Sequence, residues 1–307
     1  MSAETFANYS RLLPGVVHDM ADPHIRASEG RMVHAEWNPA NENLAFQRPE
    51  VSVWKSPYVV PTLTDRAHIA SNFLADYPTI FDTLSTDNKA NEIFQEAGEY
   101  LAQGKNVAAI TPHKDVIDIG VALLAGKDAI ELNQVRARKT GIILSKMLSG
   151  VAYVAELKND DGIVVSNEPV QVVQALSLLC DTIYMTWPRT ESAKVHTARL
   201  PQEEVDNNNQ RAKKALEENL DEGGEFLGLA STGTTHASRT QGGYIKLPGL
   251  SQGTIDIMQR PDTVLLPMLV SFDPNNPGIK VPSGLANPTT KDGVLAFMAD
   301  LELSLNS

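Results

Sequence analysis

The stretch NVAAITPHKDVID, residues 106–118, contains the pattern on which the fold prediction depends. It opens with a short, mostly apolar run, Asn106 to Ile110, which ends at Thr111 and Pro112. A short apolar run that ends at a turn signal is typical of a buried strand. We therefore expect a strand over Asn106 to Ile110, with His113 on the turn that follows it.

Comparable apolar runs recur along the rest of the chain. They are Gly162 to Val165, Thr182 to Thr186, Phe226 to Ala230 and Thr263 to Leu269. Segments with helical patterning lie between them and after them, including Asn208 to Leu220 and Val294 to Leu305. This alternation predicts an α/β fold with a mainly parallel or mixed central sheet flanked by helices. In such sheets, binding sites lie at the carboxyl ends of the strands.

The first hundred residues show a different pattern. Apolar residues recur at helical spacing between Ile69 and Leu84 and again over Asn88 to Gln103, with Gly104 as a C-terminal cap. The proline-rich stretch from Pro39 to Pro61 is interpreted as a loop. We therefore expect a smaller helical domain over residues 1–100 and an α/β domain over residues 101–307.

The composition is that of a folded globular protein. Of its 307 residues, 42% are hydrophobic and 21% are charged, and the formal net charge is -12. Because so acidic a chain has no global field that attracts polyanions, we expect no nucleic-acid partner. The single cysteine, Cys180, excludes an internal disulfide framework and favours a reducing compartment. We expect its side chain to be a buried small hydrophobe.

The chain shows no segment that resembles a targeting or membrane-spanning signal. Its first residues, MSAETFANYSRLLPG, lack the basic start and apolar run of a secretory signal. No window approaches the roughly 20 apolar residues that a membrane span needs. We expect a cytoplasmic protein with at most peripheral membrane contact, or a plastid stromal protein whose transit peptide has been removed.

His113 and Asp118 form an H-x4-D pattern directly after the first expected strand. On one continuous helix the two side chains would diverge by about 140°. With His113 on the turn and Asp118 in the first turn of the next helix, the carboxylate can reach the imidazole. It would then orient the ring and stabilise the imidazolium formed when histidine takes a proton. Asp115 is a competing partner, and a hydrogen-bonded histidine without chemical function is the alternative interpretation.

Two more strand ends carry residues suited to a phosphate. A turn of small and hydroxyl residues, followed by an arginine, allows close approach of backbone N–H groups and bidentate binding. A second segment delivers an arginine after Pro188. The candidates are Ser231, Thr232, Gly233, Thr234 and Arg239 in the first segment, and Arg189 and Lys194 in the second. In both cases the alternative is a polar surface turn with a solvated arginine.

A basic segment and a proline complete the set of candidates. Arg136, Arg138, Lys139 and Lys146 form either a local positive patch or the solvated face of a helix. Pro267 interrupts the run VLLPMLVSF, and a proline at that position implies a bulge or the end of a strand.

Taken in order, these segments resemble the glycerolipid acyltransferases. The family pattern is H-x4-D after a strand, a strand that delivers an arginine, a glycine-containing phosphate turn and a strand with proline. Here the pattern is carried by His113 and Asp118, Arg189, Ser231 to Thr234, and Pro267.

Within that family, the phosphate turn is closer to the P-S-G-G-R-D-R of the soluble, plastid-type glycerol-3-phosphate acyltransferases than to the F-P-E-G-T-R of the membrane-bound type. Those enzymes also carry an N-terminal helical domain. The chain departs from the pattern at Pro112, where the family usually has asparagine, and at Arg239, which does not immediately follow the glycine.

The resemblance implies an enzyme that moves a fatty acyl group from acyl carrier protein or coenzyme A to the 1-hydroxyl of glycerol 3-phosphate. It implies His113 as the general base, oriented by Asp118. The acceptor phosphate would be bound by Arg189 and Arg239 with the turn from Ser231 to Thr234, and Lys194 and Lys139 are further candidates. No metal or other cofactor is expected.

Two other functions stay open at this point. One is acyl transfer to a different acceptor, such as lysophosphatidate or another polar lipid. The other is a catalytically silent module that binds phosphorylated metabolites or acyl carrier protein, for which Pro112 is the sequence cue.

Overall fold

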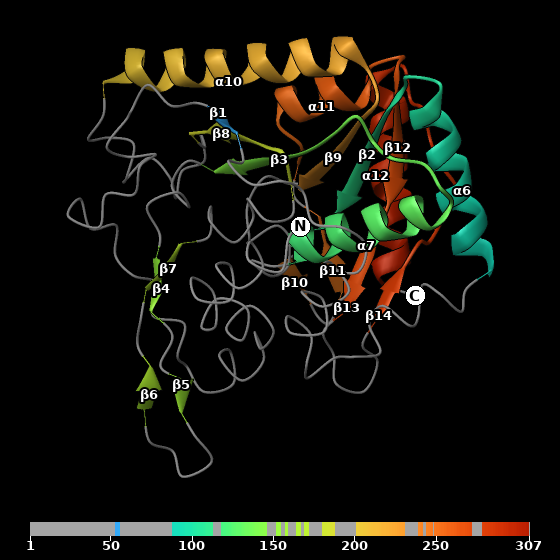
Figure 1. Cartoon of the computed structure of the whole chain (residues 1–307), viewed down its shortest axis with the longest axis horizontal. Coiled ribbons are helices and arrows are strands. Elements are labelled where there is room, and N and C mark those ends of the chain that lie inside the picture. Colours follow the sequence, from blue (N-terminus) through green and yellow to red (C-terminus); the bar gives the residue numbers. More distant parts are fainter. Residues whose placement is uncertain are drawn as a thin grey trace. The chain divides into compact units, whose positions relative to one another are not determined.

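The computed structural model (Figure 1) describes residues 53–55, 88–112, 118–145, 152–154, 157–158, 164–166, 169–171, 180–187, 201–230, 239–241, 244–247, 249–271 and 278–306. The chain forms two compact units. The first comprises Met1–Asp76 and Leu144–Glu217, and the second comprises Tyr77–Ile143 and Glu218–Ser307. Strand β3 (Lys139–Ser145) and helix α10 (Gln202–Glu222) run from one unit into the other.

A parallel sheet lies at the centre of the second unit. Its strands are, in spatial order, β3, β9 (Glu225–Ala230), β2 (Asn106–Thr111) and β12 (Thr263–Pro267), and each neighbouring pair is parallel. Every residue of β2, β9 and β12 is buried, as expected of strands covered on both faces. The structure therefore confirms the predicted α/β class.

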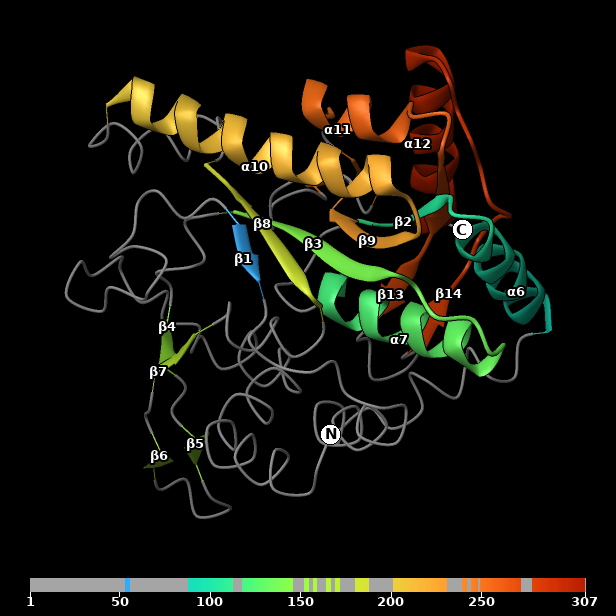
Figure 2. The same ribbon diagram turned by 45° about the horizontal axis from the view of Figure 1, so that its top comes forward.

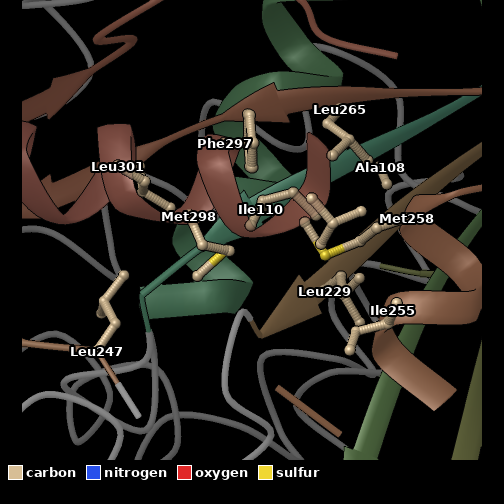
Figure 3. Close-up of a cluster of buried hydrophobic side chains, with 11 residues drawn as sticks. Ala108, Ile110, Leu229, Leu247, Ile255, Met258, Leu265, Phe297, Met298 and Leu301 are labelled. Carbon is tan, nitrogen blue, oxygen red and sulfur yellow. The ribbon is translucent and has the colours of Figure 1, made fainter. Parts of the chain in front are cut away.

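Helices α11 (Gln252–Met258) and α12 (Lys291–Leu305) cover one face of this sheet. Side chains from alternate positions of the strands pack against them in one hydrophobic cluster (Figure 3). The cluster contains Ala108, Ile110, Leu229, Leu247, Ile255, Met258, Leu265, Val294, Phe297, Met298 and Leu301. Burial of these side chains is the main force that holds α11 and α12 to the sheet.

Helices α6 (Asn88–Ala102) and α7 (Asp118–Leu132) pack against each other and against the strands. In Figure 2, β9 lies between α7 and α11, which shows the layered arrangement. Helix α6 ends as predicted, because Gly104 adopts φ 77° and its N–H donates to the carbonyl of Leu101 at 3.0 Å. The predicted helices before residue 88 lie outside the described residues.

Two short antiparallel ladders extend the second unit beyond its main strands. One joins β10 (Arg239–Gln241) to β11 (Tyr244–Lys246), and the other joins β13 (Leu269–Ser271) to β14 (Gly278–Lys280). Pro267 ends β12 as the sequence predicted, and β13 resumes after a one-residue break.

The described part of the first unit contains short antiparallel pairs and most of α10. Strand β1 (Val53–Lys55) pairs with β8 (Thr182–Thr186), β4 (Ala152–Val154) pairs with β7 (Pro169–Gln171), and β5 (Leu157–Lys158) pairs with β6 (Val164–Ser166). Strand β1 falls within the stretch interpreted as a loop.

Several expected elements differ from the structure. The described part of the run Gly162 to Val165 lies in β6, which pairs antiparallel with β5 in a separate two-stranded ladder. The basic segment around Lys139 is a strand of the main sheet and not a helix face, because the run from Ile142 to Leu144 packs within the sheet. Cys180 is buried, as expected.

Candidate functional site

The strands that precede three of the predicted motifs end at the same edge of the sheet in the second unit. Thr111, the last residue of β2, is paired with Ala230, the last residue of β9. Pro267, the last residue of β12, is paired with Ile110. The segments that follow β2 and β9, residues 112–118 and 231–239, therefore both start from this carboxyl edge.

Helix α7 begins at the carboxyl edge and runs back along the strands. A Cβ atom on Gly228 of β9 would lie 3.2 Å from Leu123 Cδ1 and 3.4 Å from Ile119 Cγ2. A Cβ atom on Gly126 would lie 2.7 Å from Phe226 Cζ, nearer the start of β9. The first turn of α7 therefore lies over the carboxyl ends of the strands. Asp118 is the first residue of this helix, as the sequence predicted. Its backbone therefore lies near the carboxyl edge of the sheet.

The hydroxyl of Thr111 lies buried at this edge. The residue is 1% exposed, and its Oγ1 atom has no hydrogen-bond partner among the described residues. Ala108 and Ile110 face α11 and α12, so Thr111 lies on the opposite face, which α7 covers. A buried hydroxyl without a partner costs free energy, and such groups in folded proteins need an explanation.

The break between β12 and β13 is built around the same edge. Pro267 has no N–H to continue the ladder, and the Met268 N–H donates to the carbonyl of Ile110 at 2.9 Å. The chain then leaves in β13, directly beyond β12. The predicted proline position is thus a strand end that changes the path of the backbone at the candidate site.

Most of the predicted site residues lie outside the described residues. These are His113, Arg189, Lys194, Ser231, Thr232, Gly233 and Thr234. Arg239 is placed by its backbone only, as the first residue of β10, where it pairs with Lys246. Figure 1 shows β10 and β11 on the side of the sheet toward which β2 and β9 point.

Lys139 is not brought to the carboxyl edge. It is the first residue of β3, which is paired with Glu225 at the start of β9, so it lies at the amino edge. Its ammonium group binds the Asn219 side chain and lies 3.7 Å from the Glu222 carboxylate. These contacts tie β3 to the end of α10, and they place Lys139 away from the strand ends that carry the motifs.

Arg138 has a similar structural position. Its guanidinium donates to the carbonyl oxygens of Gly223 at 2.6 Å and Asn219 at 2.8 Å, and it also binds the Glu222 carboxylate. These are carbonyls at the C-terminus of α10, which the helix itself leaves without partners. The basic segment, interpreted from the sequence as either a positive patch or a helix face, is at Arg138 and Lys139 a cap for a helix end.

In the first unit, α10 binds the end of β8, two residues before Arg189. The Trp187 N–H donates to Asn209 Oδ1 at 2.7 Å, and Asn209 Nδ2 donates to the Trp187 carbonyl at 2.9 Å. Asn208 Nδ2 donates to the Met185 carbonyl at 3.0 Å. Two consecutive side chains of α10 thus hold three backbone groups where β8 ends.

Sequence reasoning missed Thr111, Asn208 and Asn209. A signal for the asparagines was present, because Asn207, Asn208 and Asn209 stand in a helix interior, where asparagine is unfavourable. Such a run indicates side chains selected for hydrogen bonds to other segments. Thr111 gave a weaker signal, a hydroxyl at the end of an apolar strand.

The described residues contain no cluster of three or more histidine, cysteine or acidic side chains that could hold a metal ion. Within the same residues, no helix combines the length and apolarity that a bilayer crossing requires. No protein-family model matches the chain, and no curated protein matches it.

Proposed function

We propose that the protein is an acyltransferase that moves a fatty acyl group from a thioester, on acyl carrier protein or coenzyme A, to the 1-hydroxyl of glycerol 3-phosphate. The observation that carries the proposal is the pairing of Thr111 with Ala230. It means that the H-x4-D segment and the phosphate-turn segment leave neighbouring parallel strands at the same level. In parallel sheets, that edge is where ligands bind.

The reaction needs a base and no covalent intermediate. His113 takes the proton of the acceptor hydroxyl as its oxygen attacks the thioester carbonyl. Collapse of the tetrahedral intermediate breaks the carbon–sulfur bond, and the thiolate leaves with the proton from the imidazolium. Asp118 orients the imidazole and stabilises its charged form. Backbone N–H groups at the strand ends stabilise the oxyanion.

The acceptor phosphate provides the specificity. Arg239, at the start of β10, and Arg189 bind it together with the turn from Ser231 to Thr234, and Lys194 is a further ligand. Lys139 is left out, because its ammonium is held by Asn219 and Glu222 at the amino edge.

The test is transfer of a labelled palmitoyl or oleoyl group from each thioester carrier to glycerol 3-phosphate, with lysophosphatidate as the alternative acceptor. We expect acylated glycerol phosphate as the product, and a lower rate with lysophosphatidate. A preference for lysophosphatidate would change the acceptor and keep the reaction class. Binding of glycerol 3-phosphate without any product from either carrier would favour the silent binding module.

A further inference from the structure

We propose that Asn209 is a positioning residue for the phosphorylated acceptor, which it affects by fixing the backbone that leads into Arg189. The proposal rests on the assignment of Arg189 to phosphate binding. It concerns a residue on α10 that touches neither the acyl donor nor the acceptor.

The geometry at Trp187 is a two-point clamp. One carboxamide accepts from the N–H of Trp187 at 2.7 Å and donates to the carbonyl of the same residue at 2.9 Å. Asparagine supplies both a donor and an acceptor on one planar group, so it can hold both backbone groups of an extended residue. Trp187 is only 7% exposed, so these bonds are shielded from competing water.

Asn208 strengthens the same attachment. Its side chain is buried and donates to the Met185 carbonyl at 3.0 Å, two residues earlier on β8. It also lies 3.3 Å from the oxygen of Asn209, to which its amide donates. The amide of Asn208 therefore helps to hold the Asn209 carboxamide in the orientation that accepts from Trp187.

The clamp acts immediately before Pro188 and Arg189 in the chain. Proline restricts its own φ to a narrow range and also restricts the residue before it. The two bonds to Trp187 therefore fix the point from which the segment that carries Arg189 starts. A side chain that must meet a phosphate in bidentate fashion depends on such a fixed starting point.

The same helix offers a matched control. Asn207 is adjacent, is also an asparagine in the helix interior and is exposed. Replacement of Asn207 or Asn209 by alanine raises helix propensity equally. The difference between the two variants therefore isolates the clamp.

The experiment compares Asn207→Ala and Asn209→Ala in the full chain, with glycerol 3-phosphate as the varied substrate. For Asn209→Ala we expect KM for glycerol 3-phosphate to rise about tenfold, as the loss of one or two such hydrogen bonds implies. We expect kcat and KM for the thioester donor to stay near the wild-type values, and Asn207→Ala to match wild type throughout. Asn209→Asp keeps the acceptor for the Trp187 N–H but sets a carboxylate oxygen against the Trp187 carbonyl, so its KM should rise at least as far as that of Asn209→Ala.

Calorimetric titration with glycerol 3-phosphate separates failure of this proposal from failure of the proposed function. If wild type transfers acyl groups and Asn209→Ala shows an unchanged KM, the positioning role is overturned while the acyltransferase function stands. If wild type transfers nothing but binds glycerol 3-phosphate, a Kd that weakens in Asn209→Ala and not in Asn207→Ala still supports the role. Equal Kd values, no binding by wild type, or a parallel loss of kcat and donor affinity would overturn it.

Discussion

Asn106 and Thr111 are buried polar residues at opposite edges of the parallel sheet in the second unit, and they differ in their hydrogen bonds. At the amino edge, Asn106 is 0% exposed, yet its Nδ2 donates to the Leu220 carbonyl at 2.9 Å and its Oδ1 accepts from the Glu225 N–H at 3.1 Å. At the carboxyl edge, the Thr111 hydroxyl is nearly as buried and has no partner among the described residues.

We infer that the two edges of the sheet have different roles. The amino edge is closed by bonds that join β2, β9, β3 and the end of α10, which is where a fold gains stability. The carboxyl edge is the place from which the predicted catalytic segments leave. Substitutions at the amino edge should therefore change the free energy of unfolding, and those at the carboxyl edge should change function.

The largest effect on stability is expected from Gly223→Ala at the amino edge. Gly223 has φ 72°, and a Cβ atom there would lie 2.0 Å from the carbonyl oxygen of Gly104. The left-handed backbone and the clash with main chain together should lower the free energy of unfolding by more than about 3 kcal/mol. Urea denaturation measures the change. Gly249→Ala is the control, since nothing lies within 4 Å of its Cβ position. Similar stabilities for both variants would contradict the prediction.

Asn106→Leu should have the next largest effect. It removes one of the two hydrogen bonds that the Leu220 carbonyl accepts and leaves the Glu225 N–H without its Asn106 partner, which costs roughly 1–3 kcal/mol in the free energy of unfolding. Denaturation that shows a loss below about 1 kcal/mol for Asn106→Leu would show that the amino edge is not closed by this side chain.

Thr111→Val and Thr263→Val compare the two edges of the sheet with the same substitution. Thr111 ends β2 at the carboxyl edge, and Thr263 begins the neighbouring strand β12 at the amino edge. Thr263, at the start of β12, is also buried, but its hydroxyl donates to Asp262 at 3.3 Å. Its replacement should destabilise the fold by about 1 kcal/mol. Thr111→Val should leave the unfolding free energy unchanged or raise it by up to about 1 kcal/mol, because it removes a buried hydroxyl that has no partner among the described residues. A larger loss for Thr111→Val than for Thr263→Val would reverse the assignment of the two edges.

The smallest effect concerns pH and Asp262 at the amino edge. Burial raises the pKa of Asp262, but hydrogen bonding and attraction from Arg260 outweigh it, and the pKa lies below its ordinary value of 3.8. A depressed pKa adds stability above the unfolded value and loses it as pH falls through the folded value.

Asp262→Asn should therefore be less stable than wild type above about pH 4, by less than about 1 kcal/mol because the pair is partly exposed. The difference should vanish as pH falls below that range. Denaturation at pH 7 and at pH 3 measures it, and a difference that grows toward low pH would contradict the sign.

Much of the fold was predictable because local patterns decide it. The apolar runs of β2, β8 and β9 and the periodicity of α6 and α12 each identify an element without tertiary information. Strand β3 was missed because its apolar run, Ile142 to Leu144, is short and follows the basic residues Arg138 and Lys139. The partners of these two residues lie at the end of α10.

For the candidate site, the sequence predicted which motifs occur and their order along the chain, but not which of them lie together in space. Which strand ends meet depends on sheet order, and β9 lies beside β2 although more than a hundred residues separate them. The same non-local pairing decides that Lys139 lies at the amino edge and that Asn209 reaches Trp187. No local pattern contains that information.

The most direct test of the division between the edges is acyl transfer to glycerol 3-phosphate by His113→Ala, measured beside Asn106→Leu under conditions in which both remain folded. The account predicts that His113→Ala loses transfer by about a hundredfold or more, as expected for loss of a general base, with an unchanged free energy of unfolding. Asn106→Leu should keep its transfer rate per folded molecule. Transfer by His113→Ala at the wild-type rate would contradict the account.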